Sequence, residues 1–237
     1  MTRPLYHEDS YLREFQATIV DKVDGGVILN QSAFYPGGGG QPSDEGILKD
    51  GSNEFPVTRI RRDAGVFVHL INGKTPEIGT RITGVMNWTR RYQLMRTHTA
   101  LHILCGVIWR DYGAQVTGGD MQPLKARMDF ELEHMSVGFA KNIDQKVNAE
   151  ISSSKPVSTD FLAREEAMKI PDLIRTKINL LPPDIQQVRI VNIHDLDIQA
   201  DGGTHVANTS EVGLIRVVGH ESKGRINKRL RIEIADN

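Results

Sequence analysis

The chain has 237 residues, of which 39% are hydrophobic and 25% are charged, and its formal net charge is -1. This is an ordinary globular composition, which excludes an intrinsically disordered chain. The near-zero charge disfavours a protein that binds nucleic acid through a large surplus of Lys and Arg, and we expect no DNA partner. Because Cys105 is the single cysteine, an internal disulfide is excluded, and a buried thiol in a reducing compartment is expected.

No segment predicts a membrane span or a signal peptide. The longest apolar run, residues 103–109, is far shorter than the roughly 20 residues that a transmembrane helix needs. Residues 1–13 include Glu8 and Asp9 and lack an apolar stretch of about 7 to 15 residues. We therefore expect a cytoplasmic protein with no membrane partner.

The first third of the sequence predicts a small β-barrel over residues 1–87. Between Gln16 and Met86, short β-branched runs alternate with turn residues, and no long helix is needed. The runs fall at residues 18–20, 26–29, 57–60 and 66–71, and the turn signals at residues 24–25, 49–51 and 72–73.

After Trp88 the pattern changes to that of an α+β domain over residues 88–237. Residues 89–112 predict an amphipathic helix that stops at Gly113, since apolar residues recur at helical spacing and glycine is a common C-cap. A second helix is expected at residues 137–151. Strands are expected at residues 125–132, 157–161, 188–193, 212–218 and 225–234. The fold class is therefore predicted to be α+β, with helices packed on a mostly antiparallel sheet.

Two histidine motifs predict a metal site. In HTALH, His98 and His102 are four residues apart on the predicted helix, so they share one face. This pair could also be two core or surface histidines without a metal. Later in the chain, the glycines of DGGTH allow a tight turn that could bring Asp201 and His205 together, although a plain loop turn has the same pattern. The helix motif is not the HExxH of zinc peptidases, because Thr99 replaces the glutamate.

Two further features could contact a nucleic acid. The loop FYPGGGGQPSD has four consecutive glycines, which permit close backbone approach to a ligand or simply make the loop flexible. Basic residues cluster at residues 90–96 and 223–231, and these clusters could be phosphate contacts or solvated faces.

Taken together, five segments resemble the AlaX family of free-standing alanyl-tRNA editing proteins. They are FYPGGGGQPSDEG, WTRRYQLMRTHTALH, GAQVTGG, DGGTHVANTSEVG and ESKGRINKRLRI, in this order. The resemblance implies hydrolysis of the ester that joins serine or glycine to alanine tRNA, with one zinc ion in the site. A second, editing sieve is needed because a pocket for alanine cannot strongly reject a side chain that only adds a hydroxyl.

The resemblance also implies roles for single residues. The metal ligands would be His98, His102 and His205, and the family's usual fourth ligand, a cysteine, is replaced here by Asp201. A carboxylate is harder than a thiolate, so the site should admit other divalent ions more readily than a cysteine site. Thr117 is expected to read the serine hydroxyl, or to stabilise a turn, and Gln41 is expected to act in catalysis. The expected tRNA contacts are Gly38, Gly39, Arg90, Arg91, Lys223 and Arg225.

Two other functions remain open at this point. The first is an RNA-binding module with a structural or vestigial metal, which the loss of the cysteine would suit. The second is a hydrolase of small esters that makes no use of tRNA. The sequence does not determine the oligomeric state.

Overall fold

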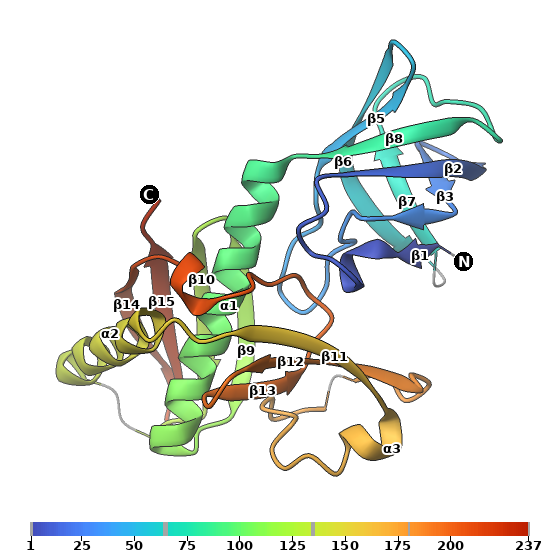
Figure 1. Ribbon diagram of the computed structural model, residues 1–237. Helices are drawn as coiled ribbons and strands as arrows, with labels where there is room; N and C mark the ends of the chain where they lie inside the picture. The colour runs from blue at the N-terminus through green and yellow to red at the C-terminus, as the bar shows by residue number, and fades with distance from the viewer. Residues whose placement is uncertain (1, 64–65, 134–135, 180, 237) are drawn as a thin grey trace. The chain divides into compact units, whose positions relative to one another are not determined.

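The computed structural model describes residues 2–63, 66–133, 136–179 and 181–236 (Figure 1). The chain forms two compact units, Met1–Gln93 and Leu94–Asn237, and the division falls within helix α1 (Trp88–Tyr112). The predicted domain boundary, near residue 87, lies at the start of this helix and stays a prediction. The architecture confirms the α+β class, because a closed antiparallel barrel is combined with helices and further antiparallel sheets.

The first unit is built around a closed barrel with the strand order β2-β3-β7-β6-β5-β8. Its strands are β2 (Glu14–Val23), β3 (Gly26–Leu29), β5 (Gly46–Asp50), β6 (Asn53–Asp63), β7 (Val66–Ile71) and β8 (Arg81–Met86). Two short strands, β1 (Arg3–Pro4) and β4 (Gln31–Ser32), pair in parallel outside the barrel, and a 3-10 turn, η1, covers Leu5–His7. The predicted small barrel is therefore confirmed.

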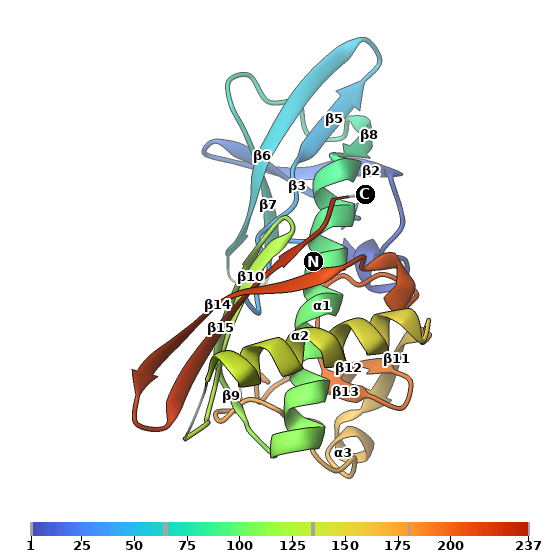
Figure 2. The same cartoon turned by 90° about the vertical axis from the view of Figure 1, so that its left-hand side faces the viewer.

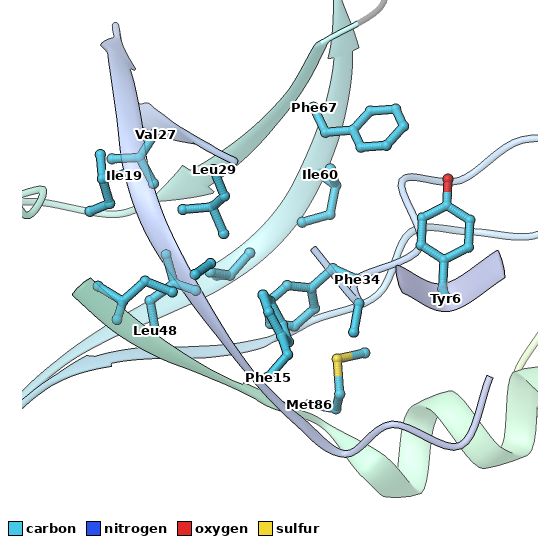
Figure 3. Close-up of a cluster of buried hydrophobic side chains, with 14 of the residues drawn as sticks. Tyr6, Phe15, Ile19, Val27, Leu29, Phe34, Leu48, Ile60, Phe67 and Met86 are labelled. Atoms are coloured by element: carbon cyan, nitrogen blue, oxygen red, sulfur yellow. The ribbon is translucent and has the colours of Figure 1, made fainter. Parts of the chain in front are cut away.

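Strands β5 and β8 were not anticipated, and for β8 the packing around a glycine explains why. Gly84 lies in the middle of β8 and interrupts its apolar pattern, yet a Cβ there would come within 2.3 Å of the Phe15 ring. Phe15 in turn meets Phe34 edge to face, with ring centroids 5.5 Å apart. Figure 3 shows both rings in the barrel core, together with Met86 and Leu48. The glycine thus creates the space that the aromatic core fills.

The second unit contains two antiparallel sheets. One has the order β14-β15-β10-β9, with β9 (Val116–Gln122), β10 (Lys125–Phe130), β14 (Ile215–Gly224) and β15 (Asn227–Ile234). The other has the order β11-β12-β13, with β11 (Val157–Ala163), β12 (Gln187–Ile193) and β13 (Asp197–Ala200). Helix α2 (Val137–Ser152) packs on β14, and α3 (Arg164–Ala167) and the 3-10 turn η2 (Thr209–Glu211) are short (Figure 2).

Helix α1 is the element that carries the predicted histidine pair. It begins after Asn87, whose side chain accepts a hydrogen bond from the Arg90 N–H at 3.2 Å, and it ends at Gly113, whose φ of 63° is left-handed. The prediction of an amphipathic helix was wrong in one respect, because every residue from Leu94 to Ile108 is buried. Over residues 94–108 the helix therefore has no solvent-exposed face. Among the described residues, no helix is both long and apolar enough to cross a membrane.

Candidate metal centre

Four side chains from two segments meet at one point in the second unit. His98 and His102 lie one turn apart on α1, with ring centroids 5.1 Å from each other. Asp201 and His205 come from the loop that follows β13. Each residue offers one nitrogen or carboxylate oxygen, and these four atoms lie within 4.8 Å of one another. The two sequence motifs, about a hundred residues apart, are therefore brought together, as predicted.

The spacing of these atoms suits a small divalent ion. Asp201 has one carboxylate oxygen 3.5 Å from Nε2 of His98 and the other 3.1 Å from Nε2 of His205. A tetrahedral ion with ligands at about 2.0 to 2.2 Å separates neighbouring ligands by about 3.3 to 3.6 Å. Three imidazoles and one carboxylate, nearly all buried, could thus hold a metal ion.

The tight turn of DGGTH is stabilised by the same carboxylate. The Gly203 N–H donates to Oδ2 of Asp201 at 2.6 Å, and Arg189 donates from Nη1 to the carbonyls of Asp201 and Gly203. The turn therefore holds Asp201 in place. The N–H of Gly203 is already used, so this donor is not available to a substrate in the structure.

His102 is oriented by a residue that no local motif marked. Its Nδ1 lies 3.0 Å from Oδ2 of Asp197, a fully buried carboxylate at the start of β13. Gln199 donates to the same oxygen at 2.7 Å. Because the Nδ1–H is bound to a carboxylate, the neutral ring presents a lone pair at Nε2, which is the arrangement found around metal-ligating histidines.

His205 has a comparable partner in Thr99. The hydroxyl of Thr99 lies 3.1 Å from Nδ1 of His205, and it also accepts a hydrogen bond from the Val206 N–H at 3.3 Å. Thr99 stands where zinc peptidases have their glutamate base. In this chain its hydroxyl orients a histidine instead, so a threonine at this position has a physical role.

The electrostatics of the cluster favour neutral imidazoles at two positions. Burial lowers the pKa of His98 to about 4, and burial together with the nearby His98 holds the pKa of His205 well below its usual range. Burial alone would also lower the pKa of His102, but the Asp197 carboxylate at Nδ1 raises it above the usual value. Burial opposes ionisation of Asp201, yet the surrounding imidazoles, His98 first, keep its pKa well below normal.

Comparison with known proteins places this chain in a family. The family model for class II (A) tRNA synthetases matches residues 9–90, and the model for the second additional domain of threonyl and alanyl tRNA synthetases matches residues 188–231. The alanyl-tRNA editing protein AlaX-M of Saccharolobus solfataricus is 40% identical over 235 residues, which cover 97% of this chain and 98% of the relative. The chain belongs to the AlaX family of alanyl-tRNA editing proteins.

Other members and relatives agree with this placement. AlaX-M of Methanosarcina barkeri is 37% identical over 245 residues, which cover 100% of this chain and 100% of the relative. The alanine–tRNA ligase of Pyrobaculum neutrophilum is 34% identical over 91% of this chain, but the match covers only 25% of the ligase. The AlaX fold of this chain therefore corresponds to one part of a much longer synthetase.

The glycine-rich loop of this AlaX chain has a backbone that requires glycine. Gly37, Gly38, Gly39 and Gly40 have φ values of 88°, 138°, 58° and 88°, all in the region that disfavours residues with a Cβ. Gly38 and Gln41 exchange two backbone hydrogen bonds, which close a tight turn. Gly38 and Gly39 are exposed at its tip, whereas the Gln41 side chain is buried. The loop is ordered by its own hydrogen bonds.

The two basic residues at the start of α1 have different surroundings. Arg90 is partly exposed and forms an ion pair with Glu45 at 3.2 Å. Arg91 is fully buried and is paired with Asp44, and it also donates to the carbonyls of Ser10 and Ala33. A contact between Arg91 and tRNA stays a prediction, and it would require this buried ion pair to open.

The remaining predicted residues lie in the second unit. Lys223 and Arg225 are exposed at the tip of the β14–β15 hairpin, where Lys223 pairs with Glu221 at 3.3 Å. Thr117 is exposed on β9, and its hydroxyl donates to the Asn227 side chain at 3.0 Å. Cys105 is buried, as expected of a core thiol. The predicted roles of Lys223 and Arg225 in tRNA binding, and of Thr117 in specificity, stay predictions.

Proposed function

We propose that this AlaX-family protein is a metal-dependent deacylase that hydrolyses the ester bond of alanine tRNA mischarged with serine or glycine. The observation that carries the proposal is the buried cluster of His98, His102, Asp201 and His205 in a chain whose AlaX-M relatives match it from end to end. A reaction on charged tRNA places the protein where translation occurs, in the cytoplasm.

Zinc is the metal that we propose for this site. A mixed imidazole and carboxylate set suits zinc, and the hard carboxylate of Asp201 also suits other divalent ions. Such an ion, when bound, supplies Lewis-acid chemistry at an ester carbonyl or at its attacking water. The protein's own contribution is to present Nε2 of His102 and His205, since Asp197 and Thr99 hold the Nδ1 atoms of these rings.

We assign the remaining predicted residues to substrate binding and selection. Thr117 would distinguish serine from alanine through its hydroxyl, and Gln41 would support catalysis from the glycine-rich loop. The exposed tips of this loop, Gly38 and Gly39, allow close approach of an RNA backbone. Further phosphate contacts are assigned to Arg90, Arg91, Lys223 and Arg225.

The decisive experiment compares the hydrolysis of serine-charged and alanine-charged alanine tRNA by the purified protein. The rates are measured before chelation, after chelation and after zinc return. We expect rapid loss of the serine ester alone, abolished by chelation and restored by zinc. His205→Ala should abolish hydrolysis, whereas His220→Ala, at an exposed histidine on β14, should not change the rate.

The same assay separates the other two functions. Binding of tRNA without hydrolysis of either ester, with metal present, would contradict the deacylase and favour an RNA-binding module. Hydrolysis of small aminoacyl esters at the same efficiency with and without an acceptor stem would favour a hydrolase that does not use tRNA. Loss of folding along with the metal would indicate a structural ion.

A further inference from the structure

Three arginines without acidic partners occupy the second half of strand β6. Arg59, Arg61 and Arg62 are exposed, and within the described part of the chain none of them forms an ion pair. Five other cations of this unit are paired with carboxylates, namely Arg3, Lys22, Lys49, Arg90 and Arg91. The chain as a whole has a net charge of -1, so this is a local excess of positive charge. We call these three residues the β6 arginine surface.

The strand geometry directs two of these side chains, those of Arg59 and Arg61, outward. Strand β5 pairs only with residues 53–57 of β6, so the segment that carries the arginines has a strand partner, β7, on one side only (Figure 2). Ile60 is buried in the barrel, and alternation along a strand therefore turns Arg59 and Arg61 to the outer face. These two side chains leave the strand about 6.6 Å apart. Arg62 follows Ile60 by two residues and therefore starts from the same face of the strand as Ile60. Its side chain is nevertheless exposed and lies over the Phe67 ring, with the guanidinium carbon 5.5 Å from the ring centroid.

The β6 arginine surface is linked to the glycine-rich loop through Ser43. The Ile60 N–H lies 3.4 Å from the hydroxyl oxygen of Ser43, which follows the glycines closely in sequence. The carbonyl of the same serine accepts a hydrogen bond from Nη2 of Arg90 at 3.3 Å. All of these residues belong to one compact unit. The backbone of the strand segment that carries the arginines therefore lies next to Ser43 of the glycine-rich loop, and this holds within one unit.

We propose that Arg59, Arg61 and Arg62 bind the phosphodiester backbone of RNA and hold the acceptor stem of the tRNA substrate beside the glycine-rich loop. The identity of the RNA rests on the proposed function. A guanidinium can bind a phosphate through two parallel hydrogen bonds, and among the described residues no carboxylate forms an ion pair with these arginines. Contacts to phosphate position a nucleic acid without reading its sequence, which suits a surface made only of arginine.

The test measures the dissociation constant between the full chain and a minihelix that copies the acceptor stem of alanine tRNA. The measurement is repeated over a range of salt concentrations. The variant is Arg59→Gln/Arg61→Gln/Arg62→Gln. A matched control, Arg3→Gln/Lys49→Gln/Arg81→Gln, removes the same charge from the same unit at exposed or partly exposed positions outside the arginine segment of β6. Lys49 is paired with Glu54 in the first half of this strand. A double variant, Arg59→Gln/Arg61→Gln, keeps the Arg62–Phe67 contact in case its loss disturbs folding.

The β6 triple variant should bind the minihelix about tenfold or more weakly than the control at the same salt concentration. Each phosphate contact removed should also reduce the slope of log K against log salt by about 1, so the triple variant should lose about 2 to 3. Its kcat/KM on serine-charged tRNA should fall in parallel, and the double variant should show a smaller change of the same kind.

Equal affinities and slopes for the triple variant and the control would overturn the inference while leaving the proposed function intact, provided the wild-type protein binds and deacylates. Failure of the wild-type protein to bind the minihelix would overturn both. Binding of the wild-type protein and the triple variant to vesicles that contain phosphatidylserine is measured as well. A loss of vesicle binding with unchanged minihelix binding would assign the surface to a membrane and would also overturn the inference.

Discussion

Asp197 offers a direct test of how the metal centre is built. Its Oδ2 lies 3.0 Å from Nδ1 of His102, and its Oδ1 lies 3.7 Å from Nε of Arg175, another buried side chain. Asp197→Asn keeps the shape of the side chain but removes its charge, and the amide can present an N–H to Nδ1. The preferred tautomer of His102 and the basicity of its Nε2 should both change.

The expected loss can be stated for two separate quantities. Removing a carboxylate that orients a metal-bound histidine weakens metal affinity by about 10- to 100-fold, or about 1.4 to 2.7 kcal/mol. The metal-free protein should also lose about 1 to 3 kcal/mol of stability, because Arg175 stays buried without its counter-charge. The pKa of His102 should fall, since burial remains and the carboxylate that raises it is gone.

The assay is a titration of metal-free protein with zinc in competition with a chromophoric chelator, performed where both proteins are folded. Asp195→Asn is the matched control. Asp195 is two residues away, its side chain is 77% exposed, and its φ of 54° suits asparagine. A zinc dissociation constant for Asp197→Asn within twofold of the control, together with reduced stability, would refute the orienting role and leave Asp197 as a partner of Arg175.

Two further predictions concern acid stability and substrate choice. Burial lowers the pKa of His69 from 6.5 to about 4. As the pH falls, the unfolded chain therefore binds a proton at this histidine before the folded chain does. The contribution of neutral His69 to the free energy of unfolding is full above pH 6.5 and is lost as the pH falls towards 4. The free energy of unfolding, measured with urea, should fall between pH 7 and pH 5 by about 2 kcal/mol more in the wild type than in His69→Gln. Equal decreases in the two proteins would contradict this prediction. Thr117→Val should reduce the preference for the serine ester over the alanine ester by about tenfold or more, whereas Thr117→Ser should retain it, as measured by deacylation of both charged tRNAs. An unchanged preference in Thr117→Val would restrict Thr117 to its hydrogen bond with Asn227.

The sequence alone determined the features that depend on near neighbours along the chain. Two histidines four residues apart on a helix must share a face, and a glycine after a helical run ends it, so His98, His102 and Gly113 could be assigned directly. The β-branched runs of β2, β3, β6 and β7 likewise predicted a barrel. The apolar pattern of α1 showed a helix, but it did not show that residues 94–108 are buried on all sides, since that depends on what surrounds them.

Only the tertiary structure decided which distant side chains meet. The contact of His102 with Asp197 spans 95 residues, that of Thr99 with His205 spans 106, and the burial of Arg91 against Asp44 spans 47. Strand β8 was hidden for a related reason, because Gly84 weakens its pattern in order to admit the ring of Phe15. The periodicity of apolar residues along a segment predicts its conformation and which of its faces is buried. The partner of a buried polar group is set by how segments fold back on one another, and no local pattern contains that information.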